Sequence, residues 1–263
     1  MIDIHHHCLP GVDDGPRTFA ESVDLCRMAA DEGIEMIVAT PHVMRGRWQN
    51  TARVELAKIL DDLRAAVGDH PRIVLGSEYF FGHDMDEMLR TESILPLAGG
   101  RYVLVEFSSH TVPPLVREPL YRVQLNGWMP IIAHPERNIV FQSKPEFLAS
   151  LIRIGVKTQV TTGSVTGEFG AEAQAAAIDW LQRGWVHVMA TDAHNVTKRP
   201  PRFRAARERV ASLAGEKIAQ SLFVDNPKSI VESRGLVYDP DLPESSGPQS
   251  GRLFGRIRKL FTK

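Results

Sequence analysis

The sequence has few cysteines, no long apolar run and almost no net charge. Two cysteines among 263 residues, Cys8 and Cys26, cannot build a disulfide framework, which suits a reducing compartment. No run approaches the roughly 18 apolar residues of a membrane span, and the first residues do not resemble a signal peptide. A net charge of −1 gives no indication of a surface that coats nucleic acid. These absences predict a soluble, cytoplasmic protein without a nucleic-acid partner.

Short apolar segments alternate with longer amphipathic ones along most of the chain. We expect strands at residues 2–4, 36–40, 72–78, 102–107, 129–134, 157–163 and 186–194. Helices are expected at residues 18–32, 51–66, 84–90, 113–126, 144–154 and 168–183, the first of them opened by a capping box of Thr18 and Glu21. This alternation is typical of a parallel sheet, and seven strands favour closure into a barrel. The sequence therefore predicts an α/β fold with one catalytic domain, residues 1–238.

The C-terminal residues differ in composition from the rest. Residues 239–251 are rich in Pro, Ser and Gly, which predicts a flexible linker. Residues 252–263, RLFGRIRKLFTK, combine five basic side chains and no acid with apolar residues at helical spacing. Two interpretations stay open. The segment is either a solvated tail or a basic amphipathic helix that contacts a membrane surface or a partner, and Gly255 weakens the second.

Metal-type side chains fall near the C-terminal ends of six of the seven expected strands. They are His5, His7, His42, Glu78, Glu106, His134, Asp192 and His194. Active sites of βα barrels are built at that end of the strands. Because side chains alternate along a strand, His5 and His7 point the same way and His6 points opposite. The other histidines, His70, His83, His110 and His187, lie outside the pattern and are expected at the surface or in packing.

The residue types indicate the chemistry of this set. Five imidazoles and three carboxylates suit Mn, Fe or Zn better than Mg or Ca. Eight ligands are too many for one ion, whereas bridging by Glu78 or Glu106 would hold two or three. Such a cluster activates water for attack and, with three ions, keeps about two net positive charges, which favours a dianionic phosphate ester. Without a cation, two carboxylates in apolar strands would be costly to bury.

Two arginines and two aspartates stand beside this set in the sequence. Arg137 follows His134 by three residues, and Arg199 follows His194 by five. Guanidinium groups match phosphate oxygens, although either arginine could instead pair with a surface acid. Asp13 and Asp14, in VDDGP, could form a turn or a cap. Asp14 could also reach the site, either as a metal ligand or as the acid that protonates the leaving group.

Taken together, the motifs MIDIHHH, VDDGP, ATPH, GSE, LVEF, AHPERN and TDAHN followed by RP resemble the CpsB/CapC family. This is the PHP-type family of bacterial manganese-dependent protein-tyrosine phosphatases. The resemblance implies a distorted seven-stranded βα barrel with about three metals. By motif match, it makes the eight metal-type residues the ligands and gives Arg137 and Arg199 the phosphate. It also implies a partner, the phosphotyrosine-bearing tail of a bacterial kinase that controls capsule or exopolysaccharide synthesis. His6 departs from the small residue expected there, and the basic tail is outside the family pattern.

Other functions can be weighed from the sequence. A cysteine phosphatase needs Arg six residues after its Cys, where this chain has Asp14 after Cys8 and Glu32 after Cys26. An amidohydrolase would have a bridging Lys at the position of Glu106. A histidinol-phosphate phosphatase of the PHP type shares the metals and remains the alternative. A non-catalytic, metal-stabilised docking module would be favoured by loss of a ligand or arginine, and none is lost.

Overall fold

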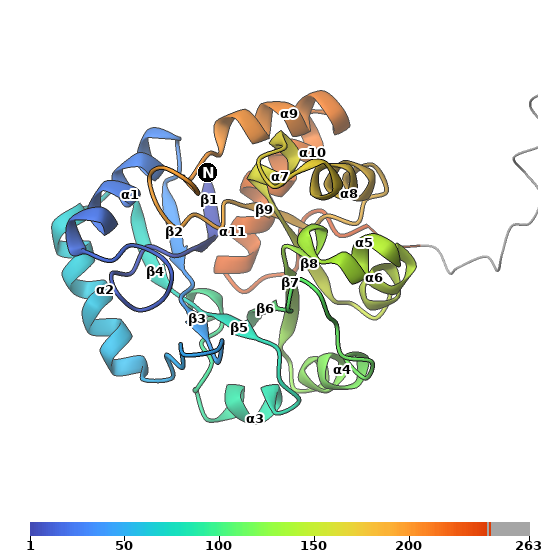
Figure 1. Ribbon diagram of the computed structural model, residues 1–263, viewed down its shortest axis with the longest axis horizontal. Coiled ribbons are helices and arrows are strands. Elements are labelled where there is room, and N and C mark those ends of the chain that lie inside the picture. The colour runs from blue at the N-terminus through green and yellow to red at the C-terminus, as the bar shows by residue number, and fades with distance from the viewer. Residues whose placement is uncertain (241, 243–263) are drawn as a thin grey trace, which may run out of the picture.

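The computed structural model describes residues 1–240 and 242. The predicted tail, 252–263, and all of the predicted linker except residues 239, 240 and 242 lie outside the described residues. Strands occupy the centre of the molecule and helices surround them (Figure 1). The neighbouring strands all pair in parallel, as the alternation of short apolar and longer amphipathic segments predicts.

The strands form two sheets. The first has the order β1 (Ile2–His6), β2 (Met36–Ala39), β4 (Arg72–Leu75). The second has the order β3 (His42–Val43), β5 (Glu78–Phe80), β6 (Tyr102–Glu106), β7 (Met129–Ala133), β8 (Lys157–Thr161), β9 (Val188–Ala190). Between β1 and β9 lies an isolated bridge, His6 to Ala193, so the fold is barrel-like without a continuous closed ladder in the described chain.

The third predicted strand, 72–78, is split in two, and a short strand follows the second, 36–40, so nine strands replace seven. Pro41 separates β2 from β3, and it has no N–H to donate to a ladder. Gly76 separates β4 from β5, and its N–H bonds to Ala39 O at 2.8 Å. A side chain at Gly76 would lie 3.0 Å from both Leu97 and Val38. As a result Glu78, predicted to end a strand, begins β5.

The helices cover the outside of the sheets. Those near predicted segments are α1 (Phe19–Asp31), α2 (Arg53–Val67), α3 (Met85–Arg90), α4 (Arg117–Leu125), α6 (Pro145–Ile152) and α8 (Ala171–Gln182). The capping box at the start of α1 is present as predicted. Not predicted were α5 (Ile139–Ser143), α7 (Thr162–Thr166), α9 (Arg204–Ala214), α10 (Glu216–Gln220) and α11 (Asn226–Val231). Among the described residues, no helix combines the length and apolar character needed to cross a membrane.

An apolar cluster fills the space between the strands below the predicted site. Ile4 packs there with Leu104, Ile131 and Ala190. The next residue, His5, already belongs to the polar site above. Strict alternation would place Ile4 and His5 on opposite faces, but the β1–β2 register shifts between Asp3 and His6. This irregularity allows consecutive residues of β1 to serve first the core and then the site.

The last described residues pack at the opposite end of the strands from the site. Asp239 Oδ1 accepts a hydrogen bond of 2.5 Å from Lys157 Nζ, at the start of β8. Asn226 Oδ1 accepts from the backbone N–H groups of Val237 and Tyr238 at 2.9 Å. The described chain therefore ends at the face away from the predicted metal ligands.

Candidate metal centre

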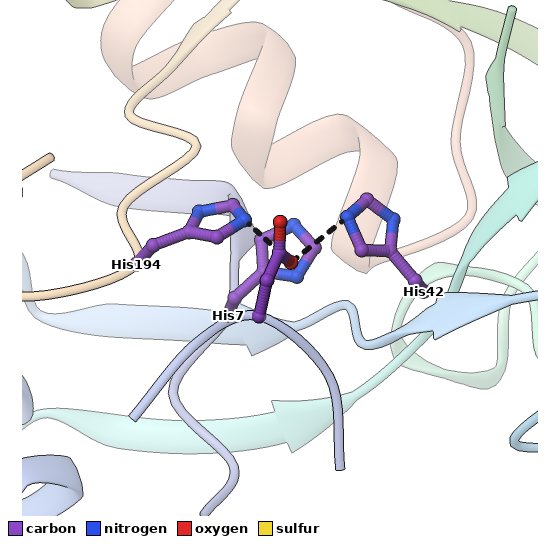
Figure 2. A group of neighbouring side chains, drawn as sticks. His7, His42 and His194 are labelled. Atoms are coloured by element: carbon purple, nitrogen blue, oxygen red, sulfur yellow. Dashed lines mark hydrogen bonds and ion pairs between the residues drawn. The ribbon is translucent and has the colours of Figure 1, made fainter. Parts of the chain in front are cut away.

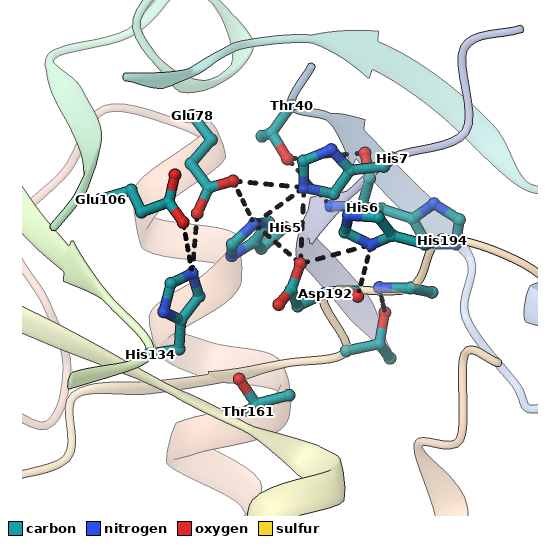
Figure 3. Close-up of polar contacts among 12 residues, drawn as sticks. His5, His6, His7, Thr40, Glu78, Glu106, His134, Thr161, Asp192 and His194 are labelled. Carbon is teal, nitrogen blue, oxygen red and sulfur yellow. Dashed lines mark hydrogen bonds and ion pairs between the residues drawn. The ribbon is translucent and has the colours of Figure 1, made fainter. Parts of the chain in front are cut away.

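The structure brings the eight predicted ligands together and adds Asp14 to them. Within the described part of the chain, three overlapping groups have ligand atoms within 4.8 Å of one another. They are His7, Asp14, His42 and His194; then His5, His7, Glu78 and Asp192; then His42, Glu78 and Glu106. His134 adjoins the last group, with Nε2 2.9 Å from Glu78 Oε1 and 3.9 Å from Glu106 Oε1 (Figure 3).

The lone pairs of these side chains face one another, which is how ligands of a common ion are arranged. His5 Nε2 and His7 Nε2 lie 3.2 Å apart. His42 Nδ1 lies 2.8 Å from Glu78 Oε2 and 3.6 Å from Glu106 Oε2. All three of these last atoms are buried, and within the described chain none makes a hydrogen bond of good geometry, although Arg45 Nε lies 2.9 Å from Glu106 Oε2. Buried polar atoms without well-aligned hydrogen bonds are costly, and a divalent cation bound between them would remove that cost. The donor set of imidazoles and carboxylates suits Mn, Fe or Zn.

Second partners orient three of the candidate histidine ligands toward the centre. His7 Nδ1 lies 2.7 Å from Asp13 Oδ2, and His5 Nδ1 lies 2.9 Å from Gln159 Oε1. His194 Nδ1 lies 2.9 Å from the backbone oxygen of Asp192. If each Nδ1 carries the proton, each Nε2 is free to bind a metal. Histidine ligands of metals are commonly oriented in this way.

Asp14 lies between two histidines at the outer side of the centre. Its Oδ1 is 3.2 Å from His42 Nε2 and 3.1 Å from His194 Nε2, and Figure 2 shows these two rings on either side of one carboxylate, with His7 alongside. Burial raises the pKa of Asp14, but hydrogen bonds with His194 and His42 outweigh it and hold the pKa well below its ordinary value. An ionised carboxylate aimed at two imidazoles fits the ligand interpretation better than the acid interpretation.

Ionisation of the central carboxylates follows from their neighbours. Burial raises the pKa of Asp192, but the charges of Arg199, His5 and Arg137 outweigh it and hold the pKa well below its usual range. Glu78 is likewise kept ionised, because nearby histidines overcome the cost of its burial. Glu106 behaves differently, since burial and the adjacent Glu78 charge raise its pKa to about 7.

The histidines divide into two sets. Burial lowers the pKa of His134 and of His194 to about 4 each, helped by Arg137 and His7 respectively. Both are therefore neutral near pH 7 and able to bind a metal. Burial also lowers the pKa of His42, but Glu78 outweighs it and raises the pKa to about 9. Proton loss from such a group accompanies metal binding.

The turn after β7 is held so that its two functional side chains face the site. His134 has φ 33° and ψ 52°, a left-handed backbone that is uncommon for residues other than glycine. The buried Glu136 anchors the turn: its Oε1 accepts from Thr161 N at 3.1 Å and from Ser164 Oγ at 2.6 Å. With Glu136 fixed, His134 contacts Glu78 and Arg137 contacts Asp192.

The two predicted arginines meet at one carboxylate oxygen. Arg137 Nη1 donates to Asp192 Oδ2 at 2.6 Å, and Arg199 Nη2 donates to the same oxygen. The other oxygen, Oδ1, lies 3.3 Å from His5 Nε2 and 3.4 Å from His7 Nε2. Asp192 thus faces the candidate ions with one oxygen and both guanidinium groups with the other. This places two fixed positive charges immediately beside the metal centre.

Three residues that contact the centre were not predicted as part of it. Asp13 was assigned a turn or cap, but its carboxylate orients His7 and also accepts from His42 N at 3.1 Å. Gln159 was not predicted, because a glutamine in a strand does not by itself indicate a metal site. Arg45 lies 2.9 Å from Glu106 Oε2 and 2.6 Å from His42 Nε2. One arginine in a loop rich in them gives no signal in the sequence.

His6, Cys8 and Cys26 are buried, and none of them belongs to the three ligand groups of the described chain. Within the part of the chain that the structure describes, neither ring nitrogen of His6 has a hydrogen-bond partner, and burial, with His7 and His194, lowers its pKa to about 3. Both cysteines are free and buried. A hydrogen bond with Cys26, together with burial, raises the pKa of the Cys8 thiol well above its ordinary value. Cys8 is therefore a poor nucleophile at neutral pH.

Structural comparison places the chain close to solved phosphatases. A crystal structure from work on YwqE of Bacillus subtilis and CpsB of Streptococcus pneumoniae, described as unique metal-dependent tyrosine phosphatases, superposes with a TM-score of 0.87 at 31% identity. The match covers 93% of this chain and 99% of the other. A phosphotriesterase homology protein from Escherichia coli, at 11% identity and a TM-score of 0.57, shares the fold alone.

Sequence comparison agrees. The tyrosine-protein phosphatase YwqE of Bacillus subtilis is 33% identical over 245 residues, covering 92% of this chain and 96% of that protein. The tyrosine-protein phosphatase CpsB of Streptococcus pneumoniae is 34% identical over 238 residues, covering 88% and 98%. Residues 1–232 match the family described as capsular polysaccharide synthesis, CpsB/CapC. The chain therefore belongs to the CpsB/CapC family, as its motifs predict.

Proposed function

We propose that the protein is a metal-dependent protein-tyrosine phosphatase. The observation that carries this is the position of Arg137 and Arg199, which share one oxygen of Asp192 while its other oxygen faces the candidate ions. A phosphate ester bound by the two guanidinium groups would present its phosphorus to the ion cluster. The relatives named as tyrosine-protein phosphatases support the same reaction.

Residues His5, His7, Asp14, His42, Glu78, Glu106, His134, Asp192 and His194 would hold two or three ions, with Mn²⁺ as the metal and Fe or Zn as alternatives. When bound, these ions would supply an activated hydroxide at neutral pH and positive charge against the phosphoryl oxygens.

The chain's own residues would do the rest. Arg137 and Arg199 would orient the phosphoryl group and stabilise the charge that grows on it in the transition state. Asp13 and Gln159 would keep two histidine rings in position. The buried, unreactive Cys8 has no part in the reaction.

We further propose that the substrate is the phosphotyrosine-bearing tail of a bacterial tyrosine kinase that controls capsule or exopolysaccharide synthesis. Support comes from the family, whose description is capsular polysaccharide synthesis. A cytoplasmic location would suit this partner.

Peripheral contact of residues 252–263 with an anionic membrane would bring the enzyme to a membrane-bound kinase, since five basic residues and no acid occur there. Because Asp239 is anchored on the face away from the metal centre, such contact would leave the site open.

The test compares a phosphotyrosine peptide with histidinol phosphate, each with Mn²⁺ and with a chelator. We expect Mn²⁺-dependent hydrolysis of the peptide, loss of activity in His42→Ala, and full activity after Cys8 and Cys26 are both replaced by Ser. Preference for histidinol phosphate would identify the alternative function. Full activity in metal-stripped protein would overturn both.

The tail is tested separately. Truncation after Gly251 should abolish binding to anionic vesicles and leave peptide hydrolysis intact. If the full chain does not bind such vesicles, membrane contact through the tail is wrong while the phosphatase proposal stands.

A further inference from the structure

The ring of Phe169 lies against both arginines of the site. The Arg137 guanidinium carbon is 4.7 Å from the ring centroid, and that of Arg199 is 6.0 Å from it. These distances are those of cation–π contacts. Phe169 belongs to the segment between α7 and α8, and it is half-buried. One aromatic side chain therefore contacts the two groups that would hold the phosphate.

The arginines need such a support because their other contacts are few. Both donate to the same oxygen of Asp192. A single oxygen fixes one end of each guanidinium group but not the plane of the group. The buried Nε of Arg199 has no hydrogen-bond partner in the described structure. The ring of Phe169 supplies the missing restraint, since guanidinium groups stack on aromatic faces.

The ring itself is seated over a glycine. A Cβ added to Gly163 would lie 2.8 Å from Phe169 Cε2 and 3.2 Å from Cδ2, so the ring would have to move. Gly163 is inside α7, where alanine is the better helix former. It has no left-handed φ that would require glycine. The ring of Phe169 can therefore occupy this position only because residue 163 has no side chain.

We propose that Phe169 is a positioning residue for phosphate binding, which fixes the planes of the Arg137 and Arg199 guanidinium groups from a seat that Gly163 leaves open. This rests on the proposed function in assigning the phosphate to the arginines. Phe169 acts through the arginines and not on the aromatic ring of the substrate. The contrasting interpretation is that Phe169 only fills space beside α7.

The direct measurement is inhibition by inorganic phosphate, together with kcat and KM, in metal-loaded protein. Phe169→Leu keeps apolar bulk but removes the aromatic face, and we expect phosphate binding to weaken about 3- to 30-fold, the range of one to two cation–π contacts. Phe169→Tyr keeps a ring face and should lose less. Phe19→Leu, which changes a 41% exposed ring at the start of α1, is the matched control and should lose nothing.

Gly163→Ala provides a second route that leaves Phe169 chemically intact. It should weaken phosphate binding by displacing the ring, without lowering thermal stability as a general packing defect would. The double variant, Gly163→Ala with Phe169→Leu, should be no weaker in phosphate binding than Phe169→Leu alone. Independent, multiplying losses would show that Gly163 and Phe169 do not act as one unit, and would overturn the proposal.

A substrate comparison separates action through the arginines from stacking on the substrate. Binding of the phosphotyrosine peptide and inhibition by inorganic phosphate, which has no ring, should weaken by the same factor in Phe169→Leu, with metal content unchanged. A loss confined to phosphotyrosine, or unaltered phosphate inhibition in Phe169→Leu and Gly163→Ala, would refute the positioning role. Failure of the wild-type protein to hydrolyse phosphotyrosine would refute the proposed function instead, and phosphate binding to it can still be measured by calorimetry.

Discussion

Replacing Glu78 with Gln is the most demanding test of the centre's electrostatics. Glu78 is fully buried, and its carboxylate contacts four imidazoles. Oε2 lies 3.3 Å from His5 and His7 and 2.8 Å from His42, and Oε1 lies 2.9 Å from His134. Glutamine has nearly the same shape, so the change removes a charge and an acceptor without opening a cavity.

The expected loss of stability can be worked out from these contacts. Removing one partner of a buried ion pair costs about 3–5 kcal/mol, because the remaining charges lose their compensation. We expect a decrease of this size in the free energy of unfolding of chelator-treated Glu78→Gln. The pKa of Glu78 is depressed well below 4.5 in the folded protein. Its contribution is therefore present above pH 4.5 and is lost as the pH falls through the depressed value.

Loss of metal should accompany the loss of stability, since Glu78 belongs to two of the three ligand groups. Even residues that only orient ligands are worth about 10- to 100-fold in metal affinity. We expect at least that decrease by calorimetry, and fewer ions per chain by elemental analysis. Glu208→Gln, at an exposed acid of α9, is the control. Unchanged unfolding at pH 7 together with unchanged metal content would refute the reasoning.

Three further predictions concern neighbouring groups. Asp13→Asn should weaken metal binding about 10- to 100-fold through misorientation of His7, and calorimetry would detect it. Metal affinity should rise with pH up to about 9, because His42, whose pKa is raised to about 9, must lose a proton first, and the proton release should appear as a buffer-dependent binding enthalpy. Asp14→Asn should remove metal and slow aryl phosphates of good and poor leaving groups equally. Sparing of the good leaving group, with metal content intact, would instead identify Asp14 as the acid.

The convergence of the candidate ligands could be predicted because of a property of parallel sheets. Their strands deliver their C-terminal ends to one edge, so ligand-type residues near those ends converge whatever the details of the loops. This rule alone predicts that Glu106 and His134 lie in the candidate site. The role of Asp14 could not be predicted in the same way. It lies in a loop, and aspartate is common there in turns, in helix caps and as a metal ligand.

Contacts made by side chains from distant elements could not be predicted in this way. Arg45 reaches Glu106 from a loop, and Gln159 reaches His5 across the sheet. Neither contact follows from spacing along the chain. By contrast, α9 could have been predicted, since its buried Ala206 and Val210 are four residues apart, on one helical face. The second strand was predicted to end before Pro41, as it does, whereas β3 beyond that proline was not predicted.

The way in which ligands are shared decides how the centre responds to change. His7, His42 and Glu78 each belong to two of the three groups, whereas Asp14, Glu106 and His194 each belong to one. Loss of a shared residue would disturb two candidate ion positions, and loss of an unshared residue would disturb one. The number of imidazoles around each carboxylate also explains why the pKa values of Glu78 and Glu106 shift in opposite directions. Glu78, among four imidazoles, stays ionised, while Glu106, beside the charge of Glu78, has its pKa raised to about 7. A cation bound between Glu78 and Glu106 would remove that repulsion, so ion binding and ionisation of Glu106 are coupled at this position.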